Sequence, residues 1–180
     1  MKKYLFYFAL TCWVLSLTAH LISLADVDIT ETIPFVWLLH VGIFVVWVPV
    51  VIDLNKGKEM KELQKSKSSI WKRQKGMYNI LFKGAPSWMR FVAIAGFFYA
   101  TINFMLFMSS QGGTPSIEEG GGYVLENRGE LVKTLTKEEY HHYKANEVRG
   151  FSGHWILFYG IATVALFRFS GFAKEEGQQE

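Results

Sequence analysis

Residues 33–52 read IPFVWLLHVGIFVVWVPVVI, an apolar run without a single Asp, Glu, Lys or Arg. At about 1.5 Å rise per residue, a helix of this length covers the roughly 30 Å hydrocarbon core of a bilayer. Three further apolar runs, 4–24, 89–109 and 151–172, carry charge only near their ends, at Arg90 and Arg168. Because only internally hydrogen-bonded segments are stable in lipid, the sequence predicts four transmembrane helices.

The charged residues between these runs predict the orientation of the chain. The connector 53–88 holds nine Lys or Arg against three Asp or Glu, whereas the connector 25–32 holds Asp26, Asp28 and Glu31 and no base. Connectors rich in Lys and Arg stay in the cytoplasm. The pattern therefore predicts a bacterial-type inner or plasma membrane protein, with both termini and 53–88 cytoplasmic and 110–150 external.

The start of the chain allows a second interpretation. Lys2 and Lys3, the apolar run and a small residue at Ala25 also suit a cleaved signal peptide. The apolar run is long for a signal core, which favours a retained first helix.

The connector 53–88 has an amphipathic stretch. Its apolar residues share one face at helical spacing, with cations around them: Ile70, Trp71, Met77, Tyr78, Leu81 and Phe82, then Lys72, Arg73, Lys75 and Lys83. This pattern is typical of a helix lying on an anionic lipid surface. The basic excess matches no nucleic-acid-binding motif, so no nucleic-acid partner is expected.

Residues 110–150 are predicted to form a small external subdomain. The stretch QGGTPS and the glycines at 120–122 indicate flexible loop, and YVLEN and ELVKTL on either side of Arg128-Gly129 indicate a hairpin. Thr136 and Glu139 have the spacing of a capping box, which predicts a helix from Lys137 into the fourth apolar run, bent near Gly150 and Gly153.

The fold class expected is an all-α integral membrane protein: a four-helix transmembrane bundle with a small external α/β-hairpin subdomain and a cytoplasmic interfacial helix. The organisation is 1–109 with three spans, 110–150 as the subdomain, and 151–180 with the fourth span and a cytoplasmic tail. Five residues are expected at the membrane interface: Trp37, Trp71, Trp88, Arg149 and Trp155.

Each predicted span carries one polar residue at a similar depth below the external boundary: His20, His40, Asn103 and His154. The simplest interpretation of this polar layer is hydrogen bonding between helices. The alternative is a cofactor, because His20, His40 and His154 could ligate a b-type haem or a metal ion.

Two further patterns in the sequence bear on possible chemistry. Gly150-Phe151-Ser152-Gly153 has the Gly-x-Ser-Gly form of some intramembrane serine proteases, in which case His20 or His40 would have to act as the base. His141 and His142 are expected to be solvated, with His142 paired to Glu138 at i,i+4.

The apolar runs have no Asp, Glu or Lys at mid-depth, which argues against a proton relay, channel or transporter. The role expected is a non-enzymatic accessory, assembly or interaction protein that contacts a protein partner through 110–150; a toxin-immunity role is compatible. The alternative is a b-haem or metal-binding membrane redox subunit.

Overall fold

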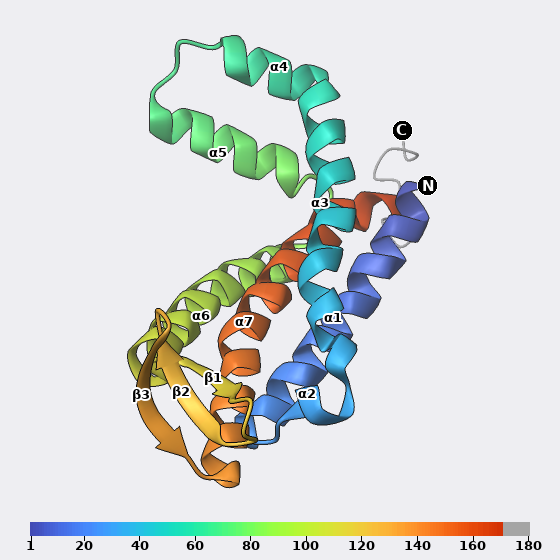
Figure 1. Cartoon of the computed structure of the whole chain (residues 1–180). Helices are drawn as coiled ribbons and strands as arrows, with labels where there is room; N and C mark the ends of the chain where they lie inside the picture. Colours follow the sequence, from blue (N-terminus) through green and yellow to red (C-terminus); the bar gives the residue numbers. More distant parts are fainter. Residues whose placement is uncertain (171–180) are drawn as a thin grey trace.

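The computed structural model describes residues 1–170; residues 171–180, which include Phe172 and the predicted tail, lie outside the described part. The described chain is mostly helical with one small sheet (Figure 1). Its elements are α1 (Lys2–Leu24), α2 (Ile29–Thr32), η1 (Pro34–Trp37), α3 (Leu38–Lys56), α4 (Lys58–Lys65), α5 (Ile70–Leu81), α6 (Ser87–Gln111), β1 (Thr114–Ile117), β2 (Tyr123–Asn127), β3 (Glu130–Leu135), α7 (Lys137–Leu166) and η2 (Phe167–Phe169).

Three helical segments are long and apolar enough to cross a membrane. They are α1, the continuous segment Pro34–Lys56 formed by η1 and α3, and α6. They coincide with the apolar runs predicted at 4–24, 33–52 and 89–109. These helices leave large apolar side chains uncovered along their length, as lipid-facing helices do, and they are consistent with a membrane protein.

The helix α7 lies at the centre of the arrangement. It packs along α1 on one side and α6 on the other, and α3 contacts both α7 and α1 (Figure 1). Its Trp155 and Tyr159 are among the largest fully buried side chains. The first turns of α7 are polar, and the helix is continuous through Gly150 and Gly153, as the predicted single long helix requires.

Glycines let the neighbouring helices approach α7 closely. A Cβ at Gly150 would lie 2.4 Å from Cγ of Phe107, and one at Gly153 would lie 2.7 Å from Nδ2 of Asn103. Small residues at such contacts are the usual means by which helices associate in membranes.

The sheet has the order β1-β2-β3, antiparallel throughout. The β2–β3 hairpin is confirmed: Asn127 pairs with Glu130, and Arg128 and Gly129 both have positive φ, as a tight I′ turn requires. The prediction of flexible loop at QGGTPS was wrong in part, because 114–117 form β1. Pro115 is tolerated there because β1 is an edge strand.

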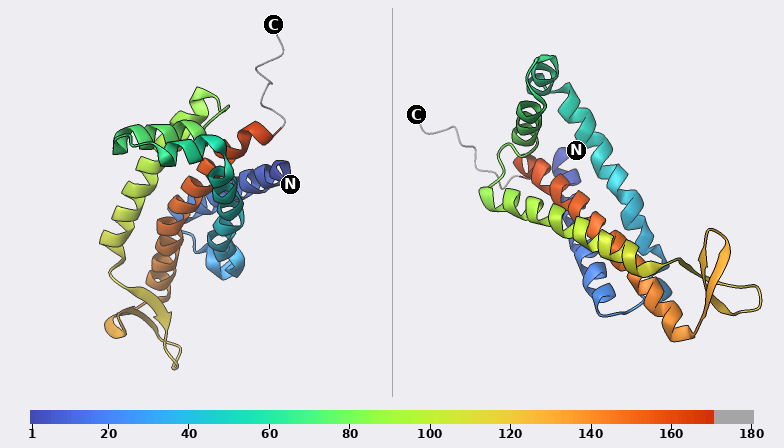
Figure 2. Two further views of the ribbon diagram at one scale, coloured as in Figure 1. Left: turned by 90° about the horizontal axis from the view of Figure 1, so that it is seen from above. Right: turned by 90° about the vertical axis from the view of Figure 1, so that its left-hand side faces the viewer.

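The connector 53–88 forms a helical hairpin. We call residues 57–83, which contain α4 and α5, the arm. α5 corresponds to the predicted amphipathic helix, whereas α4 was not predicted. The arm projects from the end of the bundle opposite the sheet (Figures 1 and 2). We refer to these two ends of the molecule as the arm end and the sheet end.

Candidate functional site: a polar cluster on α7 and the adjoining sheet

A hydrogen-bonded chain joins α1, α6 and α7; it is buried at His20 and Ser152 and exposed at Tyr99. Nδ1 of His20 lies 2.7 Å from Oγ of Ser152, and Nε2 of His20 is hydrogen-bonded to the hydroxyl of Tyr99. Ser152 is fully buried and His20 almost so. The structure thus brings together Ser152 and one of the two histidines that the sequence offered as its base.

The hydrogen bonds of Ser152 favour a structural role for this contact. The Ser152 hydroxyl donates to the carbonyl of Arg149 at 3.2 Å, so its oxygen is left to accept from Nδ1–H of His20. In this arrangement Nε2 of His20 accepts from Tyr99, and His20 has no free nitrogen to take the serine proton. A nucleophile must also be reached by its substrate, and Ser152 is covered on all sides.

The other members of the predicted polar layer contact the same part of α7 separately. Asn103 donates to the carbonyls of Arg149 and Gly150, at 2.8 and 3.3 Å. His40 accepts a 3.0 Å hydrogen bond at Nδ1 from Nε1 of Trp155. His20, Asn103 and His40 therefore contact residues 149–155 of α7, the segment that holds His154, but the four predicted residues do not form one network.

The three histidines proposed as ligands have different surroundings within the described chain. His20 uses both ring nitrogens in hydrogen bonds, His40 uses Nδ1, and the ring of His154 packs edge-on against Phe104 at 4.7 Å. Within residues 1–170, no group of three or more His, Cys, Asp or Glu side chains is placed to hold a metal ion.

The residues expected at the membrane interface have different surroundings. Trp71 and Trp88 are exposed at the arm end, as interfacial residues would be. Trp155 is instead fully buried, with its ring edge-on to Trp37 at 5.5 Å. Arg149 is half-buried, and its backbone carbonyl accepts hydrogen bonds from Asn103 and Ser152.

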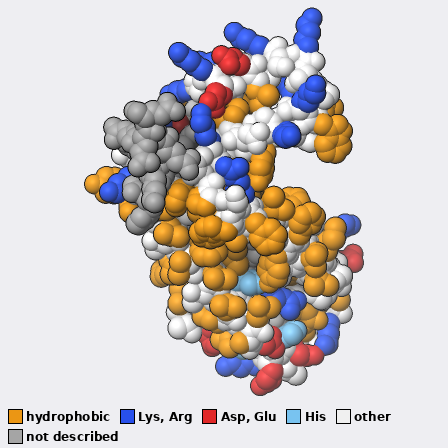
Figure 3. Space-filling model, turned by 180° about the vertical axis from the view of Figure 1, so that it is seen from behind, with side chains coloured by type: hydrophobic (Ala, Val, Ile, Leu, Met, Phe, Trp, Pro, Cys, Tyr) orange, Lys and Arg blue, Asp and Glu red, His pale blue; other side chains and the backbone are white. Residues whose placement is uncertain are grey.

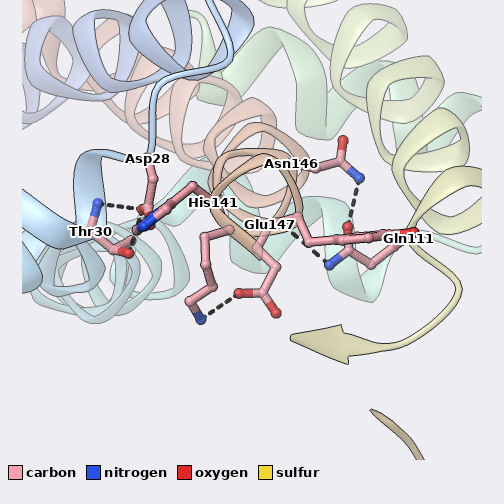
Figure 4. Close-up of polar contacts among 8 residues, drawn as sticks. Asp28, Thr30, Gln111, His141, Asn146 and Glu147 are labelled. Carbon is pink, nitrogen blue, oxygen red and sulfur yellow. Dashed lines mark hydrogen bonds and ion pairs between the residues drawn. The ribbon is translucent and has the colours of Figure 1, made fainter. Parts of the chain in front are cut away.

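At the sheet end, the connector between α1 and η1 is held against α7 by two His–Asp pairs. Nδ1 of His141 lies 2.9 Å from Oδ2 of Asp28, and Nδ1 of His142 lies 2.7 Å from Oδ1 of Asp26. Figure 4 shows His141 reaching Asp28, which also accepts from Thr30. His142 is exposed, as expected, but its partner is Asp26 and not the predicted Glu138. His141 is half-buried against Asp28, so the expectation that it is solvated was wrong.

Asp28 is the more firmly held of the two aspartates. Burial alone would raise the pKa of its carboxyl group, but hydrogen bonds from Thr30 and His141 outweigh burial and lower that pKa below its ordinary value. Asp26 is exposed and has a φ of 62°, a left-handed conformation that Asp adopts more readily than most residues.

Further contacts fix the sheet to the same helix. Nδ2 of Asn146 donates to Oε1 of Gln111 at 2.6 Å, which ties the end of α6 to α7 (Figure 4). The predicted capping box of Thr136 and Glu139 is confirmed at the start of α7. Lys133 on β3 pairs with Glu139 at 2.5 Å; the hydrogen bond between them raises the pKa of Lys133 and lowers that of Glu139.

The strand β3 is the uncovered part of this end. The side chains of Leu131 and Val132 are 59% and 53% exposed, and of the six residues of β3 only Leu135 is buried. The pairing of β3 with β2 shifts between Leu125 and Glu126, which leaves Val132 as the extra residue of a bulge. The outer edge of β3 pairs with no other strand in the described chain.

The fold and site define a mostly helical protein with three candidate membrane-spanning helices and a small sheet fixed to a central helix. Comparison with protein-family models, with characterised proteins and with solved structures finds no match to this chain.

Proposed function

We propose that the chain is a four-helix membrane protein in which α1, η1–α3, α6 and α7 cross a bacterial-type inner membrane. The N terminus and the arm would be cytoplasmic, and residues 110–150 would form the external subdomain. Three long apolar helices and the concentration of Lys and Arg in the arm support this arrangement. The central position of α7 supports it too, because a helix enclosed by other helices can be less apolar than those that face lipid.

Within that membrane we propose a non-enzymatic role as an accessory, assembly or interaction protein. The partner would be another protein, bound through the 110–150 subdomain. The observation that carries this proposal is the exposed apolar pair Leu131 and Val132 on the free edge strand β3. Proteins usually protect such edges, and an edge held rigidly in place is a ready surface for a partner strand or an apolar patch.

The polar cluster on α7 supports a non-enzymatic role. Ser152 is buried and its hydrogen bonds are satisfied within the protein. The alternative of a haem or metal subunit gains no support from His20, since both of its ring nitrogens have protein partners. A Soret band in the protein purified in mild detergent would overturn this part of the proposal.

Site-specific photocrosslinking in cells tests the partner surface. A benzoylphenylalanine in place of Leu131 is expected to give one discrete protein adduct. Val132→Asp should abolish that adduct, whereas Glu119→Lys, on the exposed β1–β2 loop, should leave it unchanged. An adduct that survives Val132→Asp, or the absence of any adduct from β3, would overturn the proposed contact.

A further inference from the structure

The arm has a fixed base and a free tip. At its base, Phe82 is buried with Ala85, Met89 and Val164, so that the end of α5 is attached to α6 and α7. The linker 66–69 at the opposite end lies farthest from the bundle (Figures 1 and 2). The tip therefore extends beyond the packed helices and does not pack against them.

The two helices of the arm hold each other in place. Met60 of α4 is buried, and Gly76 of α5 leaves room for Leu63, since a Cβ there would lie 2.6 Å from a Leu63 methyl carbon. The ion pair between Lys83 and Glu59, at 2.5 Å, ties the end of α5 to α4. The arm is thus a defined hairpin, although α5 itself buries no residue.

Large apolar side chains are uncovered at the free end. Trp71 is 81% exposed and Ile70 is 71% exposed, and both lie next to the linker 66–69. Ile70 and Met77 also border an open hollow of about 320 Å³ between α4 and α5, with Arg73 beside them. Large apolar side chains exposed together on an ordered element indicate an interaction site.

The charge around these side chains selects an anionic partner. Among the three acidic residues of 53–88, Asp53 pairs with Lys2 and Glu59 pairs with Lys83, which leaves Glu62 to offset the remaining cations. Lys72, Arg73 and Lys75 of α5 make no ion pair within the described chain. In the space-filling view of Figure 3, Lys and Arg side chains gather at the arm end, beside apolar ones.

The position of the arm identifies the partner as a lipid surface. The arm follows α3 directly and precedes α6, and both are candidate membrane-spanning segments. Both ends of the arm therefore lie at the level where these helices leave the hydrocarbon core of their own bilayer. A Trp and an Ile surrounded by Lys and Arg suit the boundary between acyl chains and phosphate headgroups, whereas nucleic acid would leave the apolar groups without a partner.

We propose that the arm binds anionic phospholipid in the membrane that holds the bundle. Trp71 and Ile70 enter the headgroup layer, and Lys72, Arg73 and Lys75 contact lipid phosphates. Each cation near an anionic leaflet multiplies the ratio of docked to undocked arm about fivefold. This inference rests on the proposed membrane arrangement but not on the external partner surface, so the lipid contact and the protein contact can fail independently.

A fluorescent label beside the tip tests the proposal in the whole protein. Ser69 is exposed and makes no side-chain cap hydrogen bond, so a Cys12→Ala, Ser69→Cys protein can carry an NBD group there. The protein is placed in nanodiscs of phosphatidylcholine alone or of an equimolar mixture with phosphatidylglycerol. We expect blue-shifted, stronger NBD emission only with phosphatidylglycerol, and reversal by molar salt, which screens charge within a few ångströms.

Two variants complete the experiment. Replacing Lys72, Arg73 and Lys75 by Gln should lower the docked ratio about a hundredfold, whereas replacing Lys137 and Lys144, at the sheet end, should leave it unchanged. Equal emission in both lipid mixtures, or a full shift in the triple Gln variant, would overturn the proposal. A shift produced by adding duplex DNA to phosphatidylcholine nanodiscs would also overturn it, in favour of nucleic acid.

Discussion

His141 and Asp28 are 113 positions apart in the chain, yet Nδ1 of His141 lies 2.9 Å from Oδ2 of Asp28. The contact joins the short connector after α1 to the polar turns of α7 that carry the sheet. It is also where Asp28 caps α2 by accepting from the backbone of Thr30. The carboxylate of Asp28 therefore stabilises the local fold of the connector and also attaches the connector to α7.

Removing the charge of Asp28 should weaken the protein measurably. Asp28→Asn is expected to cost about 1–2 kcal/mol of unfolding free energy, because charged hydrogen bonds to a buried group are lost. Asp26→Asn is the matched control: its pair with His142 is exposed, and such pairs contribute less than about 1 kcal/mol. Thermal unfolding in mild detergent measures both, and equal effects would contradict the difference in burial.

The lowered pKa of Asp28 predicts a dependence on acid. Since the folded carboxyl has a pKa below that of the unfolded chain, its contribution is complete above about pH 4 and is lost as pH falls through the folded pKa. The difference in melting temperature between the wild type and Asp28→Asn should therefore shrink as pH falls from about 4 toward about 2. A difference that stays constant over that range would show that the charge of Asp28 does not stabilise the fold.

The glycines of α7 should tolerate no side chain. Gly150→Ala is expected to destabilise by about 1–3 kcal/mol, because the new methyl would overlap the ring of Phe107. Gly153→Ala is expected to cost about as much, because the methyl would push the Asn103 amide away from the carbonyls that it binds. Gly96 of α6 is the control, since nothing lies within 4 Å of its missing Cβ. Gly96→Ala should be neutral or slightly stabilising in the same thermal measurement; a loss as large as that at Gly153 would exclude close packing as the cause.

Ser152→Ala should lower the stability of the fold without removing a catalytic activity. Its removal takes a buried partner from His20 and is expected to cost about 1 kcal/mol, near the usual value for hydrogen bonds between membrane helices. Ser109→Ala, at an exposed position on α6, should have little effect. A fluorophosphonate probe is expected to leave Ser152 unmodified, and covalent labelling at Ser152 would show that it is an accessible nucleophile.

Local patterns in the sequence predicted most of the elements correctly. Hydropathy located α1, η1–α3 and α6, because a helix in lipid must be apolar over its whole length. The Thr136–Glu139 spacing predicted the start of α7, and the Arg128-Gly129 pair predicted the hairpin. In each case the determining interaction lies within a few residues of the chain.

Interactions between distant residues were the ones missed. The partner of His142 is Asp26, which no local spacing indicates, and β1 resembles a loop until β2 pairs with it. Depth along a helix placed His20, His40 and Asn103 near one segment of α7. Which polar groups meet depends on how each helix is rotated about its own axis. A helix that is apolar on every face has no amphipathic pattern from which that rotation can be predicted.

Labelling of single cysteines in intact cells tests the membrane arrangement most directly. In a Cys12→Ala background, Gly120→Cys adds a thiol to the β1–β2 loop, where nothing surrounds the missing Cβ, and Lys67→Cys adds one to the exposed tip of the arm. A membrane-impermeant maleimide should label position 120 in intact cells and position 67 only after permeabilisation. Labelling of position 67 in intact cells, or protection of position 120, would contradict the proposed orientation.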